Sequence, residues 1–102
     1  MAILVNIEKP RYSLRKSRSR MIWNAICLGR AEKGNISVRV DNNDPGVVVF
    51  SYRGTDILAW NRDTGDIVDI HAGIYDQTPS TRNQRKMARQ AIEEFRRVVM
   101  ES

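Results

Sequence analysis

Short apolar runs separated by polar turns make up the middle of the chain. Three of them, 47–52, 56–60 and 66–71, are rich in β-branched and aromatic residues, which pack well on the pleated surface of a sheet. Arg53-Gly54-Thr55 separates the first two runs. Asp63-Thr64-Gly65 precedes the third and suits a type I turn whose glycine takes the left-handed position of a short hairpin loop. The pattern therefore predicts consecutive antiparallel strands joined by tight turns.

Another strand is predicted upstream, at 36–40, where apolar and polar residues alternate. Because successive side chains of a strand point to opposite faces, we expect the apolar ones to face the core and Ser37 and Arg39 to point outward. The segment 41–46 is rich in Asp and Asn and contains Pro-Gly. We interpret it as a turn, since no bidentate Glu follows at the spacing that a calcium loop needs.

Residues 21–28, MIWNAICL, fit two interpretations. As a helix, the run would bring residues at three- and four-residue spacing onto one apolar face; as a strand, it would pair with 36–40 across a turn at Gly34-Asn35. Periodicity alone does not decide between the two for so short a run. We favour the strand, because Trp23 and the isoleucines of this run are better strand formers than helix formers.

The last segment, 79–101, is the clearest helix. Thr81-x-x-Gln84 fits a capping box at its start, with Ser80 as an alternative cap. Glu93 is placed four residues from both Arg89 and Arg97, which favours ion pairs along the helix. The apolar residues of this segment recur at helical spacing and form one stripe: Ala88, Ala91, Ile92, Phe95, Val98 and Val99.

Together these elements predict one α+β domain over residues 1–102. It consists of an antiparallel sheet of four or five strands, mostly a meander, packed on one face by the C-terminal helix. Within it we distinguish a basic N-terminal arm at 1–20, which includes a short strand, a β-rich part at 21–78 and the helix at 79–101. On the predicted register Val47, Val49 and Ile57 lie on the uncovered sheet face, which favours a homo-oligomer.

Charge is distributed unevenly along the chain. Residues 1–40 hold nine Lys/Arg and two acidic residues, residues 41–79 hold two Arg and seven acidic residues, and residues 80–102 hold six Lys/Arg and three acidic residues. Basic ends thus flank an acidic middle within a net charge of +5. Such segregation bears on the partners of a protein rather than on its fold.

The densest basic cluster is the stretch 9–20, which holds six Lys/Arg and no acidic residue. Arginine offers planar multi-donor contacts to phosphate, and a tyrosine can stack on a base. The alternative is a solvated loop, or a segment that folds back on the acidic middle of the chain. We select as candidate anion- or partner-binding residues, from this stretch and from the helix, Arg11, Tyr12, Arg15, Lys16, Arg18, Arg20, Arg82, Lys86 and Arg89.

Catalytic and metal-binding chemistry is sparse in this sequence. His71 is the only histidine and Cys27 the only cysteine, which excludes two-histidine metal sites and an internal disulfide. The lone cysteine suits a reducing cytoplasm. No apolar run approaches the roughly 20 residues of a membrane span. We therefore expect no catalytic residues, no metal, no cofactor and no membrane association.

The middle and late parts of the chain resemble small phage-encoded accessory proteins of unassigned function, over roughly residues 50–90. Gly54, Leu58-Ala59 and Ala72-Gly73-Ile74-Tyr75 carry the resemblance, followed by Thr78-x-Ser80-Thr81-Arg82. It implies a viral accessory origin, a place in the cytoplasm of the host cell, and no catalytic residues.

Three hypotheses for the function follow. The first is a non-enzymatic phage-type accessory protein that binds and inhibits a host complex, such as a defence or nucleic-acid-handling complex, through its basic surfaces. The second is a simple DNA- or RNA-binding module that uses the same surfaces. The third is a pocket that sequesters an anionic nucleotide. Partners are then a host protein or nucleoprotein complex, or DNA or RNA itself.

Overall fold

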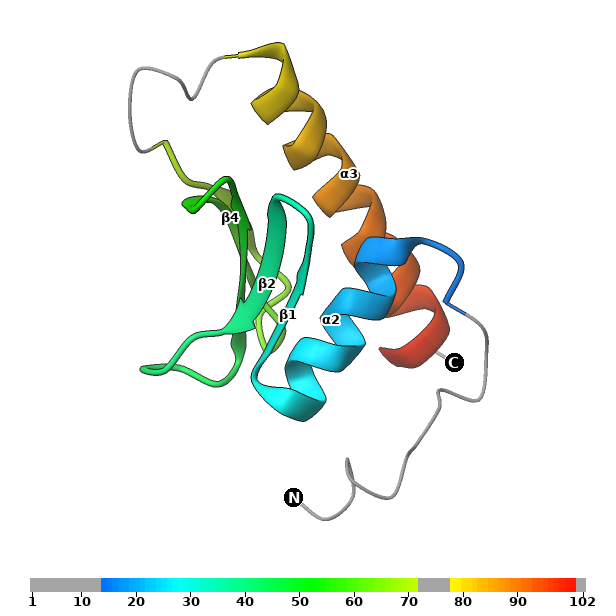
Figure 1. The fold of residues 1–102 in the computed structure, drawn as a ribbon. Helices are drawn as coiled ribbons and strands as arrows, with labels where there is room; N and C mark the ends of the chain where they lie inside the picture. Colours follow the sequence, from blue (N-terminus) through cyan, green and yellow to red (C-terminus); the bar gives the residue numbers. More distant parts are fainter. Residues whose placement is uncertain (1–13, 72–77, 101–102) are drawn as a thin grey trace.

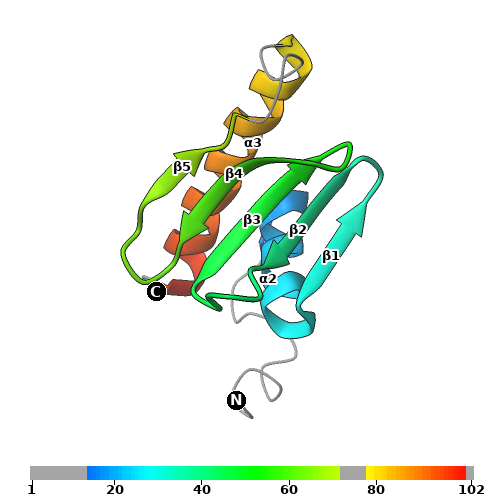
Figure 2. The same ribbon diagram turned by 90° about the vertical axis from the view of Figure 1, so that its left-hand side faces the viewer.

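The computed structural model describes residues 14–71 and 78–100, which form a sheet with two helices on one of its faces (Figures 1 and 2). The five strands are antiparallel neighbours in sequence order, β1-β2-β3-β4-β5. The predicted α+β meander with a C-terminal helix is therefore confirmed. The elements, in chain order, are α2 (Ser17–Leu28), β1 (Arg30–Lys33), β2 (Ile36–Val40), β3 (Val47–Tyr52), β4 (Thr55–Asn61), β5 (Ile67–Asp69), α3 (Pro79–Phe95) and the π-helical continuation η2 (Arg96–Met100).

The strand predicted at 21–28 is wrong, because these residues belong to helix α2. The helix ends at Gly29, whose φ of 91° is the left-handed conformation of a common helix end, and whose N–H donates to Ala25 O at 2.6 Å. Ile22 and Ala25 are fully buried, so tertiary packing outweighs the strand preference of single residues. The turn at Gly34-Asn35 exists, but the strand that it joins to β2 is β1.

Helix α2 also changes the predicted division of the chain. It begins at Ser17, inside the segment interpreted as a basic arm, and Leu14 before it is only 5% exposed. Residues 14–20 are thus part of the packed domain, and the β-rich part starts at β1 rather than at residue 21. The strand expected near the N-terminus, together with Arg11 and Tyr12, lies outside the described residues.

A β-bulge in β4 explains another difference from the predicted register. Phe50 pairs with Leu58 and Ser51 pairs with Asp56, so Ile57 is an extra residue between them. Ile57 is 3% exposed and packs in the core, and Val49 is 6% exposed. Ile57 was predicted to lie on the uncovered face, and that prediction is wrong. Val49 pairs with Arg39 and does lie on the uncovered face, but it is buried there. The homo-oligomer was expected because three apolar side chains would be exposed on the uncovered face. Of these three, only Val47 is partly exposed.

The core lies between the sheet and the two helices. The predicted stripe of the C-terminal helix is confirmed, since Ala88, Ala91, Ile92 and Phe95 are buried and Val98 and Val99 pack at its margin. The ring of Phe95 meets Trp60 of β4 edge-on at 5.9 Å between centroids, and Trp23 of α2 at 6.5 Å. Trp60 is fully buried and belongs to this core.

Helix α3 starts earlier than the predicted capping box. Thr78 is the cap, its side-chain oxygen accepts a hydrogen bond from Thr81 N at 3.2 Å, and Pro79 occupies the first helical turn. The assignment of Thr81 or Ser80 as the cap is therefore wrong. Proline suits this position because its missing N–H would have no partner inside the helix.

Polar contacts join α2 to the far half of α3. Ser19 Oγ donates to Ala91 O at 2.8 Å, and the Lys16 N–H donates to the Glu94 carboxylate at 3.0 Å. Glu94 is only 4% exposed, and its negative charge lies at the N-terminal, electropositive end of α2. Because α2 has no side-chain cap of its own, Glu94 supplies the acceptor that its first turn needs.

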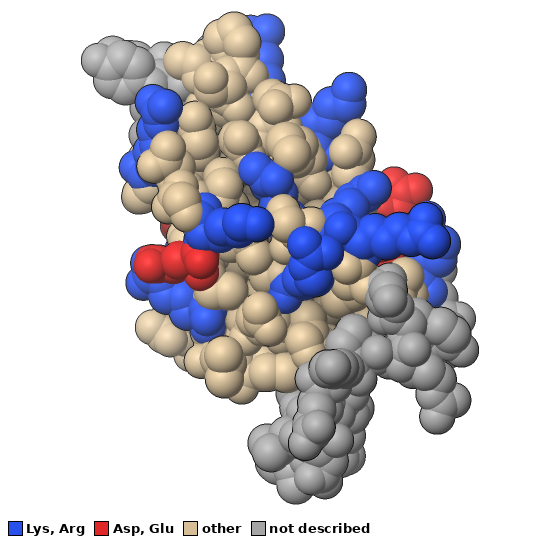
Figure 3. Space-filling view, turned by 45° about the vertical axis from the view of Figure 1, so that its right-hand side comes forward, with Lys and Arg blue, Asp and Glu red and all other residues tan. Residues whose placement is uncertain are grey.

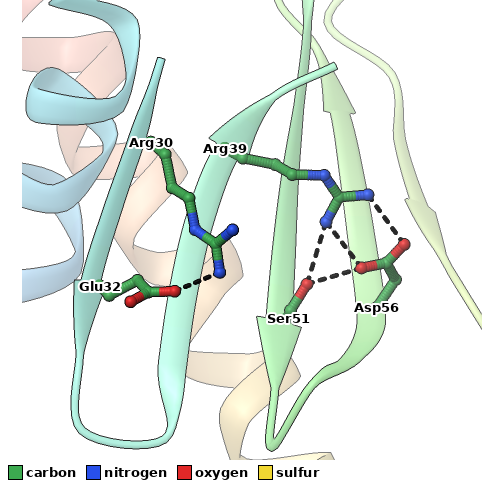
Figure 4. Close-up of polar contacts among 5 residues, drawn as sticks. All are labelled: Arg30, Glu32, Arg39, Ser51 and Asp56. Carbon is green, nitrogen blue, oxygen red and sulfur yellow. Dashed lines mark hydrogen bonds and ion pairs between the residues drawn. The ribbon is translucent and has the colours of Figure 1, made fainter. Parts of the chain in front are cut away.

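The opposite sheet face is not covered by the described helices (Figure 2). Arg39 of β2 binds Asp56 of β4 through two hydrogen bonds, of 2.8 and 3.0 Å, and Ser51 between them donates to Asp56 at 2.6 Å (Figure 4). Arg30 pairs with Glu32 on the neighbouring strand β1. These charges are compensated locally. None of the helices in the described ranges is long and apolar enough to cross a membrane.

Candidate functional site

Basic side chains follow the flank of α3 that lies next to strand β5. The first three recur at four- and three-residue spacing, and a further pair follows seven residues later in η2, so the row continues along one side of the helix. At 1.5 Å per residue the row extends for about 22 Å from its first member to its last. All its members are exposed: Arg82, Lys86, Arg89, Arg96 and Arg97. Glu93 is the acidic residue within this row, and we call the whole row the basic face of α3.

Two adjoining hollows accompany this row. The first hollow has a volume of about 440 Å³ and the second about 430 Å³, and both share Arg89 and Glu93. The first is lined by Asp69, His71, Arg82, Arg85, Lys86, Arg89, Gln90 and Glu93. The second is lined by Ile67, Arg89, Ile92, Glu93, Arg96 and Arg97. The hollows thus form a continuous path along α3 beside the end of the sheet.

The first hollow has an excess of positive charge. Four basic side chains face two carboxylates, Asp69 and Glu93. Arg89 Nη2 donates to Asp69 Oδ1 at 2.7 Å, and both side chains remain partly exposed. The predicted pair of Arg89 with Glu93 is therefore wrong, because β5 supplies a nearer carboxylate. Within the described chain the side chains of Arg82 and Lys86 have no ion-pair partner.

Arg85 forms the floor of this hollow and is 7% exposed. Its Nε donates to Ile57 O at 3.0 Å and its Nη2 donates to Ile70 O at 2.6 Å. The carbonyl group of the bulge residue Ile57 thus binds a side chain of α3. A buried guanidinium fixed in this way holds the helix against β4 and the end of β5, and it adds a positive charge beneath the hollow.

The basic residues of α2 lie apart from the hollows. Arg18 Nη2 donates to Gln84 Oε1 at 2.5 Å, and burial lowers the pKa of the Arg18 guanidinium. Arg20 Nη1 donates to the carbonyl oxygens of Leu14 and Arg15, each at 2.9 Å. These two arginines therefore also stabilise the chain around the start of α2.

Seven of the nine candidate residues predicted from sequence lie in the described chain, and they fall into two groups. Arg82, Lys86 and Arg89 line one hollow, whereas the four from the N-terminal segment, Arg15, Lys16, Arg18 and Arg20, line neither. Figure 3 shows the helical side of the molecule, at the right in Figure 1, where Lys and Arg side chains are spread over the surface with few acidic side chains among them. The structure thus joins the three helix residues and leaves the α2 set as a second basic region.

Sequence reasoning missed Asp69 and His71 as members of the site. From the sequence, His71 was considered only as the single histidine of the chain, and Asp69 was not selected. Both line the first hollow because β5 runs beside α3, a proximity that no local pattern records. Cys27 is exposed on α2 and lines neither hollow, so it forms no site with His71 there.

The described residues contain no group of three or more His, Cys, Asp or Glu side chains that could hold a metal ion. Comparison of the chain with protein-family models, with curated proteins and with solved structures finds no match. The basic face of α3 is therefore characterised by its own geometry and charge.

Proposed function

We propose that the protein is a non-enzymatic accessory protein of the phage type, which acts in the host cytoplasm. It binds an anionic surface of a host complex through the basic face of α3 and thereby blocks that surface. The observation that carries the proposal is the row of exposed cations, of which Arg82 and Lys86 have no ion-pair partner in the described chain. Cations without a partner bind external anions without first giving up an internal contact.

The position of these cations on α3 adds to the argument. Helix α3 carries four basic residues before its first acidic residue, Glu93, and its first turn holds no acidic residue. A positive side chain in the first turn of a helix, here Arg82, is unfavourable by roughly 0.3–1 kcal/mol because it lies at the positive end of the helix dipole. A bound anion removes this repulsion, so the arrangement favours association over the isolated state.

The lining also indicates the kind of contact. No Phe, Tyr or Trp lines either hollow among the described residues, and His71 is the one ring in their lining. Cationic side chains outnumber rings in this lining, so we propose that binding rests mainly on contacts to phosphate or carboxylate groups. A surface that accepts nucleic acid, or the phosphates of a nucleoprotein complex, fits this chemistry.

A simple DNA- or RNA-binding module is the second candidate. The length of the row, about 22 Å, favours it, because a straight row of that length reaches several successive phosphates of one strand. Such a module would bind nucleic acid with a strong salt dependence and without a host protein.

The test uses two triple variants of equal charge change. One carries Arg82→Gln, Lys86→Gln and Arg97→Gln on the basic face, and its control carries Arg30→Gln, Lys33→Gln and Arg53→Gln, all exposed and away from the hollows. Each is used to capture partners from host lysate, with and without nuclease, and to bind an oligonucleotide over a salt series. Melting temperatures verify that both variants fold.

We expect the basic-face variant to lose capture while the control retains it. Capture that survives nuclease supports the host-complex inhibitor, and capture that nuclease abolishes supports the nucleic-acid module. For a duplex, loss of three phosphate contacts would reduce the salt slope by about 2.7. Equal loss in both variants, or no loss in either, would contradict a role for the basic face.

A further inference from the structure

The first hollow has the features of a site for one particular kind of anion. We infer that it binds a phosphomonoester group, with Arg82 and Lys86 as direct ligands and with Arg89 transferred to the phosphate from Asp69. This inference rests on the proposed role of the basic face and names the ligand class of one part of it. The group could belong to a mononucleotide or to the end of a nucleic-acid strand, and the test separates these sources.

The charge of the hollow matches a dianion. Four cationic side chains and two carboxylates leave two positive charges in excess when His71 is neutral. A phosphomonoester carries about −1.5 to −2 at pH 7, whereas an internal phosphodiester carries a single charge. The terminal group therefore neutralises the hollow more completely than a backbone phosphate does.

The spacing of the ligands suits one compact group. Arg82 and Lys86 are one helical turn apart, and Arg89 follows three residues later on the same side. Neighbours in this series have Cβ atoms about 5–6 Å apart, and all three side chains line the same hollow, so they are within reach of one compact group there. Arginine binds phosphate through two parallel hydrogen bonds, and lysine adds a compact charge.

The third ligand, Arg89, is available to a phosphate only when it leaves its ion pair with Asp69. Asp69 holds Arg89 Nη2 at 2.7 Å, and the Arg89 side chain is 46% exposed, so it is free to exchange one oxygen partner for another. A phosphate oxygen that replaces Asp69 Oδ1 gives the guanidinium a dianionic acceptor in place of a monoanionic one. Asp69 thereby competes with the ligand and lowers its affinity.

The size and surroundings of the hollow allow a nucleotide. Its volume of about 440 Å³ falls in the range of small-molecule sites, which is about 300–1,000 Å³. The second hollow continues past Arg89 towards Arg96 and Arg97. A strand whose terminal phosphate occupies the first hollow would place its next phosphates along these arginines.

The experiment compares matched ligands on the full chain. Calorimetric titrations use inorganic phosphate and a nucleoside 5′-monophosphate, and anisotropy titrations use one short oligonucleotide with either a 5′-phosphate or a 5′-hydroxyl. The variants are Arg82→Gln and Lys86→Gln in the first hollow, with Arg97→Gln as the control of equal charge change outside it. A second pair is Asp69→Asn, with Asp66→Asn as the acidic control that lines neither hollow.

We expect 5′-phosphorylation to tighten oligonucleotide binding about tenfold, and Lys86→Gln or Arg82→Gln to remove most of that gain, because a hydrogen bond to a charged group is commonly worth about a factor of ten or more. Arg97→Gln should weaken both oligonucleotides equally. Asp69→Asn should tighten the phosphorylated ligands about two- to fivefold, as expected for release of one surface ion pair, and Asp66→Asn should not. Tight binding of the 5′-monophosphate alone would assign the site to free nucleotides, whereas a gain seen only on the oligonucleotide would assign it to strand ends.

Two results would overturn the inference. One is equal binding of the phosphorylated and hydroxyl oligonucleotides together with no binding of the 5′-monophosphate. The other is an equal effect of Asp69→Asn and Asp66→Asn on phosphate binding. It would show that Arg89 does not exchange Asp69 for the phosphate. Either result leaves the capture experiment with the basic-face variant unaffected. Conversely, capture that the basic-face variant retains, together with the expected loss of phosphate binding in Arg82→Gln and Lys86→Gln, would contradict the proposed function alone.

Discussion

At the scale of single residues, the Arg39–Ser51–Asp56 network shows how one carboxylate becomes tied to the fold (Figure 4). Two hydrogen bonds from Arg39 stabilise the ionised form of Asp56 and hold its pKa below the ordinary value of 3.8. Partial burial opposes this, and the hydrogen bond from Ser51 adds to it. The same bonds raise the pKa of Arg39. The three side chains come from β2, β3 and β4, so they link three strands on the uncovered face.

This network predicts a defined dependence of stability on pH. A carboxyl group whose pKa is lower in the folded state stabilises the protein above its unfolded pKa, and this contribution is lost as the pH falls through the folded pKa. Asp56→Asn should therefore lower the free energy of unfolding at pH 7. It should also reduce the stability that the protein loses when the pH falls from 7 to about 3, because that loss occurs near and below the usual Asp pKa. Urea unfolding at several pH values measures both. A variant with an unchanged pH profile would contradict the role of Asp56.

The alternation of apolar and polar residues along 36–40 predicted part of this network correctly. It indicated that Arg39 and Ser37 point away from the core, and both lie on the uncovered side of β2. It did not predict that Arg39 meets Asp56, because that contact depends on the register of two hairpins. The bulge at Ile57 shifts this register, and no residue in the sequence marks it as a bulge.

At the scale of elements, the C-terminal helix was predictable and α2 was not. Segment 79–101 is long, strongly periodic and charged, so its amphipathic pattern is unambiguous. Segment 21–28 is short and apolar, and its helical state depends on packing against α3, β1 and β2 rather than on propensity. The polar residues that complete α2, such as Ser19 and Glu94, act through contacts more than 70 residues apart in sequence.

The start of α3 gives a prediction at this scale. Thr78→Ala should destabilise the domain by about 1 kcal/mol, because the Thr81 N–H loses the oxygen that accepts it. Ser80→Ala serves as the control, since Ser80 is exposed and is not the cap; it should change stability by less than about 0.5 kcal/mol. Chemical unfolding of both variants measures the difference. A larger loss for Ser80→Ala than for Thr78→Ala would place the cap at Ser80.

At the scale of the whole molecule, the sequence predicted the cations of the site but not their grouping. Charge counting selected Arg82, Lys86 and Arg89 together with the basic residues of the N-terminal segment. The structure separates the two sets, because α2 packs on one flank of α3 while β5 lies along the other. Asp69 forms an ion pair with Arg89 and so competes with any external anion for this cation. It belongs to the site only because the edge strand β5 lies beside α3.

The last prediction concerns Phe95, which lies where the two helices and the sheet meet. Phe95 is 2% exposed and touches Trp60 of the sheet and Trp23 of α2, so its ring joins both helices to β4. Phe95→Ala should lower the free energy of unfolding by about 3–5 kcal/mol through lost burial and the cavity that remains. Tryptophan fluorescence and far-UV circular dichroism should report the same shifted transition, because the core is shared.

Leu28→Ala is the matched control for this substitution. Leu28 is a large apolar residue at the end of α2, but it is 80% exposed, so its truncation should cost less than about 0.5 kcal/mol. The contrast tests burial rather than apolar character as the source of stability. An unchanged melting temperature for Phe95→Ala would mean that α3 does not pack through this face. The alignment of Arg82, Lys86 and Arg89 with β5 would then also fail, since the same packing places that flank of α3 beside Asp69.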